Sequence, residues 1–153
     1  MAMLISLSKS NYGDTEPWKP GILQFLDHLT DDYPDFHEWI DKVFNQIPLG
    51  TRIILMDVCD GLIRGLVILK TDSDEKKICT FKVDEKYQRQ GIGTRLLHES
   101  YKMLGTNKPM ISVSERHIDA FKPFLEKEGF ELKRTVLSLY RQGRREFFFN
   151  GGP

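Results

Sequence analysis

The residues with the clearest chemical potential lie between Val83 and Leu97, a stretch that contains two glycines spaced by one residue, Gly91 and Gly93. An apolar, strand-like run ends at Val83, and a helix-like pattern begins after Gly91. Glycine at a strand-to-helix turn lets backbone N–H groups approach an anion, because no Cβ stands in the way. The positive end of the following helix points at the same place. The stretch therefore predicts a phosphate-binding turn.

Two other phosphate-binding turns have different sequences. A dinucleotide turn needs a third glycine, here near Leu96, and an early βαβ unit. A P-loop needs Gly-Lys-Ser/Thr where this chain has Gly93-Thr94-Arg95. The sequence provides neither, so the remaining alternative to a phosphate site is a tight turn that binds no ligand.

Composition predicts a single domain over residues 1–153, since 153 residues with 40% hydrophobic and 29% charged content are typical of one globular unit. Lys plus Arg and Asp plus Glu both number 22, and this balance argues against a nucleic-acid partner. We expect no membrane partner and a cytoplasmic location, because no apolar run or leader sequence is apparent. Cys59 and Cys79 are predicted to be core thiols, and no metal site is expected.

The elements that position the glycine turn follow from hydrophobic periodicity. Helices are predicted over 22–29, 36–47, 92–104 and 118–128, with a loop over 11–18. Pro123 should start or kink the last helix. Strands are predicted over 3–7, 52–58, 62–69, 77–83, 109–113, 130–140 and 145–149, with a turn over 71–75.

This order of elements, with two local motifs, resembles the GCN5-related N-acetyltransferase (GNAT) family. The family's loop motif, Arg/Gln-x-x-Gly-x-Gly/Ala, appears as Gln88-Arg89-Gln90-Gly91-Ile92-Gly93. Its Phe-Tyr-x-Lys-x-Gly-Phe block is similar to Phe124-Leu125-Glu126-Lys127-Glu128-Gly129-Phe130. The resemblance implies an α/β (α+β) fold, in which four helices flank a mixed, mostly antiparallel sheet of about seven strands.

The resemblance also implies a function. The chain would transfer an acetyl group from acetyl-CoA, its co-substrate, to a primary amine of an unidentified acceptor by direct attack. Loop amides would hold the pyrophosphate, the backbone at 81–83 would pair with the pantetheine arm, and an N–H near Phe81 would stabilise the oxyanion. The implied cofactor-binding residues are Phe81, Val83, Gln88, Arg89, Gln90, Gly91, Ile92, Gly93, Thr94, Phe121 and Phe124.

The usual proton-transfer residues of the family are not carried over. Leu125 stands where many members have tyrosine, and Lys77 stands where some members have glutamate. Candidates after the predicted strand 109–113 are Glu115 or His117 as proton relays, together with Ser114. Alternatively, Ser114 or Glu115 caps the next helix and His117 is solvated.

The missing proton-transfer residues keep a second function open, a catalytically silent acyl-CoA-binding module with a sensing or scaffolding role. For an enzyme, a small-molecule amine is favoured over a protein amine as acceptor. The chain is expected to be a monomer or a homodimer.

Overall fold

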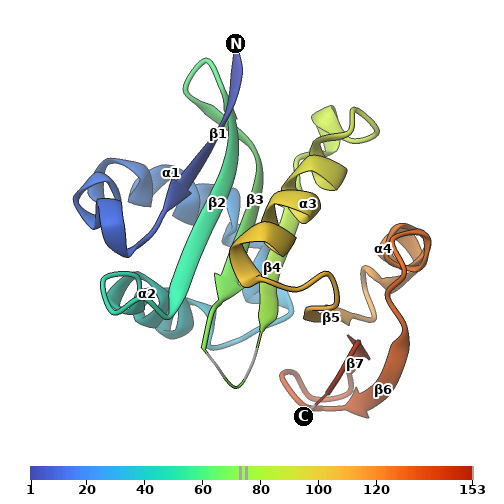
Figure 1. Ribbon diagram of the computed structural model, residues 1–153. Helices are drawn as coiled ribbons and strands as arrows, with labels where there is room; N and C mark the ends of the chain where they lie inside the picture. The colour runs from blue at the N-terminus through green and yellow to red at the C-terminus, as the bar shows by residue number, and fades with distance from the viewer. Residues whose placement is uncertain (73, 75, 153) are drawn as a thin grey trace.

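The computed structural model describes residues 1–72, 74 and 76–152, so the predicted turn over 71–75 lies partly outside the described residues. Seven strands form one sheet in the order β1-β2-β3-β4-β5-β7-β6 (Figure 1). The strands are β1 (Ala2–Leu7), β2 (Arg52–Cys59), β3 (Leu62–Lys70), β4 (Lys77–Val83), β5 (Met110–Ser114), β6 (Leu132–Leu137) and β7 (Arg145–Phe149). Only the β4–β5 pair is parallel among these strands, which confirms the predicted mixed, mostly antiparallel sheet.

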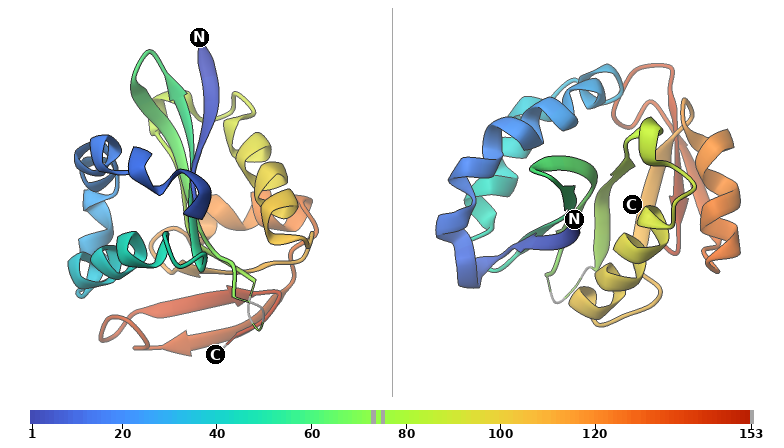
Figure 2. Two further views of the ribbon diagram at one scale, coloured as in Figure 1. Left: turned by 60° about the vertical axis from the view of Figure 1, so that its left-hand side comes forward. Right: turned by 90° about the horizontal axis from the view of Figure 1, so that it is seen from above.

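Four α-helices cover the two faces of the sheet. They are α1 (Lys19–Phe25), α2 (Phe36–Gln46), α3 (Ile92–Leu104) and α4 (Ile118–Lys127). Viewed from above, α1 and α2 lie on one side of the sheet, and α3 and α4 lie on the other (Figure 2). Each side has its own apolar core, because the strands alternate their side chains between the two faces.

The N-terminal and C-terminal predictions need correction. The predicted loop 11–18 contains two 3₁₀ helices, η1 (Lys9–Asp14) and η2 (Glu16–Trp18). The predicted helix 22–29 ends as α1 at Phe25 and is followed by a third 3₁₀ helix, η3 (Asp27–Asp31). Helix α4 does not start at Pro123 but includes it. The strand predicted over 130–140 shortens to β6, whose side chains are largely exposed.

Two contacts fix α3 against the sheet. Gly65 of β3 lies so close to α3 that a Cβ there would stand 2.7 Å from Leu96 Cδ1. Asp57 of β2 is fully buried and accepts hydrogen bonds from Arg64 of β3 and Arg95 in the first turn of α3. These contacts set the position of the helix N-terminus and of the turn that leads into it.

Candidate active site

The sheet opens between β4 and β5. These parallel strands pair only through Lys77–Met110 and Ile78–Ile111, so they separate after their first residues. The β3–β4 register also shifts between Ile68–Thr80 and Leu69–Ile78, which places an extra residue, Cys79, in β4. A β-bulge of this kind interrupts the ladder and redirects neighbouring backbone groups. The opening therefore leaves an edge of β4 facing a gap within one sheet.

The glycine turn forms as predicted at the end of this open strand. Arg89 and Gly91 both have left-handed backbones, with φ of 64° and 81°. The first hydrogen bond of α3 runs from Arg95 N–H to Gly91 O, so the N–H groups of residues 92–94 precede the helical ladder. Such N–H groups form an anion site at the positive end of the helix.

A cavity of about 910 Å³ occupies the opening. It runs past both separated strands and is bounded by η3, the start of α2, the start of α4 and the β6–β7 loop. Of the predicted cofactor residues, Phe81, Val83, Gln88 and Phe121 line it. Gln88 also donates to Val83 O at 3.2 Å, which ties the turn to the strand end.

Three predicted aromatic residues meet beside this cavity. Phe81 of β4 lies 5.4 Å from Phe121 and 5.8 Å from Phe124, measured between ring centroids. A Cβ added at Gly93 would stand 3.7 Å from both Phe81 and Phe124. The aromatic cluster therefore joins the open edge of β4 to the glycine turn, and Leu125 packs in the core rather than in the cavity.

The three predicted proton-transfer residues have different surroundings. Ser114 lines the cavity, and its buried Oγ makes no hydrogen bond within the described part of the chain. His117 also lines it and places Nε2 3.2 Å from Asp32 Oδ2. Glu115 instead accepts the backbone N–H of Arg145 at 2.6 Å, so it joins the end of β5 to β7.

Asp32 is a buried anchor for several cations at this edge. Its Oδ1 accepts a hydrogen bond from Arg144 Nη1 at 2.7 Å and lies 3.5 Å from Arg116 Nη1. Because Arg144 belongs to the β6–β7 loop, Asp32 links η3 to that hairpin across the cavity mouth. His117 is one more partner of this anchor and is half exposed.

A hydrogen-bonded pair of partly buried Tyr33 and buried Glu146 was not predicted from sequence. Tyr33 lines the cavity and donates its hydroxyl to Glu146 Oε2 at 2.9 Å. Burial raises the pKa of Glu146, although hydrogen bonds from Ser112 and Tyr33 oppose the shift. Burial and the adjacent carboxylate also raise the pKa of Tyr33. The sequence did contain a sign that Glu146 is buried. It lies two residues before Phe148 in the apolar run Arg145–Phe149, and residues two apart in a strand share a face.

Lys82 and His28 form a second unpredicted pair in the cavity wall. Lys82 Nζ donates to Phe25 O at 2.7 Å and lies 3.2 Å from His28 Nδ1. Burial lowers the pKa of both groups, and the neighbouring Lys82 charge lowers the pKa of His28 further. The pair connects β4 to the helical region that covers the cavity.

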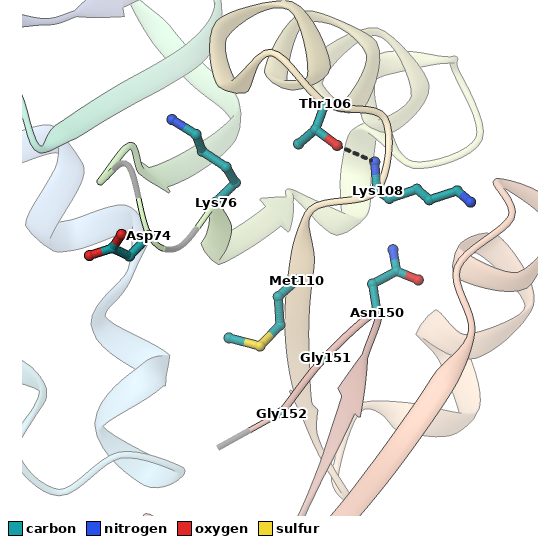
Figure 3. Close-up of a pocket in the computed structure, with 8 residues that line it drawn as sticks. All are labelled: Asp74, Lys76, Thr106, Lys108, Met110, Asn150, Gly151 and Gly152. Carbon is teal, nitrogen blue, oxygen red and sulfur yellow. Dashed lines mark hydrogen bonds between the residues drawn. The ribbon is translucent and has the colours of Figure 1, made fainter.

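A second pocket, of about 610 Å³, lies before the paired residues of β4 and β5 (Figure 3). Lys76 and Lys108 line it, and their side chains point away from each other. Its lining includes neither the open edge of β4 nor Gln88. The cavity in the sheet opening reaches Phe81, Val83 and Gln88, although residues 89–94 do not line it, and it is therefore the candidate active site. The described residues contain no group of three or more potential metal ligands, and none of their helices is long and apolar enough to cross a membrane.

Comparison with known proteins gives one family. A family model described as an acetyltransferase (GNAT) domain matches residues 34–143. No curated protein matches the chain in sequence. The matched range contains the glycine turn, the open strands and both predicted motifs.

Solved structures share the fold. A Bacillus anthracis protein in complex with acetyl coenzyme A matches at 22% identity and TM-score 0.56, over 65% of this chain and 61% of that one. The chain thus spans less than two thirds of that protein. The Escherichia coli ribosomal-protein-S18-alanine N-acetyltransferase matches at 18% identity and TM-score 0.65, over 97% and 92%. An aminoglycoside 6′-N-acetyltransferase complexed with coenzyme A matches at 14% identity and TM-score 0.64, over 99% and 98%.

Proposed function

Because the chain belongs to the GNAT acetyltransferase family, we propose that it transfers the acetyl group of acetyl-CoA to a primary amine by direct attack. The observation that carries this proposal is the alignment of three features along β4: an open strand edge, a cavity beside it, and a glycine turn at its end. Acetyl-CoA is an extended molecule, and these features match its parts: the glycine turn suits the pyrophosphate, the strand edge suits the pantetheine arm, and the cavity suits the thioester.

The proposed binding site for acetyl-CoA, the acetyl donor, uses backbone groups more than side chains. The N–H groups between Arg89 and Thr94 would hold the pyrophosphate, and the β4 edge over 81–83 would pair with the pantetheine arm. The thioester would then lie near the bulge at Cys79, where the N–H of Phe81 can stabilise the oxyanion. Phe121 and Phe124 would flank the arm.

The reaction needs a proton acceptor for the amine. As the amine nitrogen bonds to the acetyl carbon, the carbon–sulfur bond breaks and the nitrogen loses a proton. We propose that the Tyr33 hydroxyl takes this proton while passing its own to Glu146, since Tyr33 lines the cavity and its hydroxyl lies 2.9 Å from Glu146 Oε2. A carboxylate with a raised pKa is a better base than an ordinary one.

The departing thiolate needs a proton donor. Ser114 is the predicted residue best placed to relay a proton from water to the thiolate, taking up one proton as it gives its own, because its hydroxyl is buried at the cavity wall and makes no hydrogen bond to another described residue. His117 is a second donor, although Asp32 already holds it. Glu115 is the weakest of the three, because its carboxylate is used by the Arg145 N–H.

The cavity is bounded by helices on one side and the β6–β7 loop on the other, and these walls favour a small-molecule amine over a protein amine. The rival function, a silent acyl-CoA-binding module, would use the same donor site without proton transfer. Thiol release on mixing acetyl-CoA with a panel of amines separates the two. Tight cofactor binding with no thiol release from acetyl-CoA in the presence of any amine would support the silent module.

The donor site is tested by Gly91→Glu. The substitution places a carboxylate beside the proposed pyrophosphate and strains a backbone with φ of +81°. Calorimetric titration with coenzyme A should show no measurable binding. Gly61→Glu is a matched control, because Gly61 has φ of +79°, has no atom within 4 Å of its Cβ position and lies in the β2–β3 turn. Equal affinity of the Gly91→Glu and unaltered proteins would refute the assignment.

A further inference from the structure

The end of the cavity farthest from the glycine turn is rich in cations. Arg52 of β2, Lys70 of β3 and Lys77 of β4 all line it, beside Cys79 and Trp39. The glycine turn follows Val83, six residues along β4 from Lys77, or about 20 Å at the rise of an extended strand. These cations are therefore remote from the proposed pyrophosphate site.

Arg52 is buried, and among the described residues it has no acidic partner. Its exposed fraction is 9%, and no carboxylate oxygen of the described residues lies within 4.0 Å of it. Nε donates to Gln46 Oε1 at 2.8 Å, Nη1 contacts Cys79 Sγ at 2.9 Å, and the guanidinium lies over the Trp39 ring. A buried cation with only neutral partners is costly unless an anion compensates it.

Lys77 also lacks a carboxylate within 4.0 Å among the described residues. Lys70 differs, because its Nζ lies 3.9 Å from Asp72 Oδ2. Lys77 lines the same cavity as Arg52 and Cys79, and its charge acts to lower the pKa of both Glu146 and Cys79. Asp35 is the acidic residue that lines this part of the cavity, at the N-terminus of α2.

We propose that this end of the cavity binds an anionic group of the acceptor, so that the acceptor is an amine that also carries a carboxylate or a phosphate. Arg52 and Lys77 would contact the anion directly. Arg52 keeps the N–H groups of Nη2 for this contact, because its hydrogen bonds to the described residues use Nε and Nη1. The amine would then face Tyr33, and the anion would fix its orientation toward the thioester. This inference rests on the proposed acetyl transfer and narrows its substrate class.

The test compares acceptors that differ only in charge. A series of ω-amino acids is assayed against the corresponding carboxamides, and phosphoethanolamine against ethanolamine, with thiol release as the readout. We expect kcat/KM to be at least about tenfold higher for the anionic member of the best pair, since a charge-assisted contact is lost in the neutral one. The two arms distinguish carboxylate from phosphate.

Lys77→Met removes the charge and keeps much of the apolar stem. It should lower kcat/KM for the anionic acceptor about tenfold more than for its neutral partner, because only the anionic acceptor loses a charge-assisted contact. Lys77→Glu should reverse the preference. Lys102→Met is the matched control, because Lys102 is exposed on α3 and its side chain pairs with Glu99. Coenzyme A affinity, measured by calorimetry, should be unchanged in all three variants.

Each outcome decides the inference. Equal kcat/KM for anionic and neutral acceptors, or an equal loss for both in Lys77→Met, would overturn the anion site while acetyl transfer stands. Exclusive use of neutral or polycationic amines would overturn it too. If coenzyme A binds but no amine of the panel causes thiol release, the proposed function and this inference both fail.

Discussion

At the scale of single residues, Glu146 has the most unusual environment, because a carboxylate is costly to bury and is rarely buried unless it is paired or functional. Its partners are hydroxyl groups rather than cations, and burial raises its pKa. A proton acceptor must be deprotonated to act, so activity should increase as the pH rises through that raised pKa.

We expect Glu146→Gln to lower kcat by about a hundredfold, the usual contribution of a positioned base. The acidic limb of the pH–rate profile should disappear in this variant. Tyr33→Phe should lower kcat similarly, because it breaks the same proton path. Initial rates of thiol release across a pH series measure both effects.

The stability of the same variants gives an independent check. A carboxyl group whose pKa is raised by folding binds its proton more tightly in the folded state, so its contribution to stability falls as pH rises through that pKa. Glu146→Gln should therefore be at least as stable as the unaltered protein at neutral pH. A loss of activity explained by unfolding, or an unchanged acidic limb, would contradict the assigned role. A larger effect from His117→Gln or Glu115→Gln would move the role to those residues.

At the scale of elements, the contact between α3 and β3 determines where the glycine turn stands. Gly65 allows this contact, since a Cβ there would lie 2.7 Å from Leu96 Cδ1 and 3.0 Å from Ile92 Cγ2. Leu96 is fully buried, so its side chain has little room to move away. Any displacement would act on the first turn of α3, where the proposed pyrophosphate site begins.

Gly65→Ala should lower the free energy of unfolding by about 1–3 kcal/mol, the typical cost of overpacking a core. It should also weaken coenzyme A binding, because α3 must shift. Urea unfolding and calorimetry measure the two effects. Gly13→Ala is the control, since a Cβ there meets no atom within 4 Å. Full stability with full affinity would show that the helix position tolerates a methyl group.

At the scale of the whole molecule, the sheet consists of two parts joined weakly. Strands β1–β4 form one continuous antiparallel part, and β5, β7 and β6 form the other. Only two residue pairs connect β4 to β5. Asp32 adds ionic contacts to Arg144 and Arg116 across the same opening. A ligand in the opening would touch both parts at once.

Coenzyme A should therefore stabilise the folded state as a whole. At a concentration about 100-fold above Kd, binding should add about 2.7 kcal/mol to the free energy of unfolding. Thermal unfolding at increasing coenzyme A concentration, with Gly91→Glu as a non-binding reference, measures this. Hydrogen exchange should slow in β5 as well as β4. Protection confined to the glycine turn would show that the ligand does not bridge the two parts.

The sequence by itself determined the elements and the glycine turn, because both depend on local patterns. Hydrophobic periodicity identifies helices and strands, and Gly91 adopts its left-handed backbone through its own lack of a side chain. The sequence did not predict the short 3₁₀ helices or the inclusion of Pro123 within α4, because local patterns there are compatible with more than one backbone conformation. The order of the predicted elements, together with the motifs Gln88–Gly93 and Phe124–Phe130, also indicated the family.

Only the tertiary structure decided which polar groups meet. Tyr33 and Glu146 are 113 positions apart, and His117 and Asp32 are 85 apart, so no local pattern could pair them. Arg52 and Lys77 become a cationic end of one cavity because β2, β3 and β4 pair side by side while β5 turns away. The glycine turn indicates the class of cofactor, and the long-range packing of polar groups around the opening determines which proton transfers and which acceptors are possible.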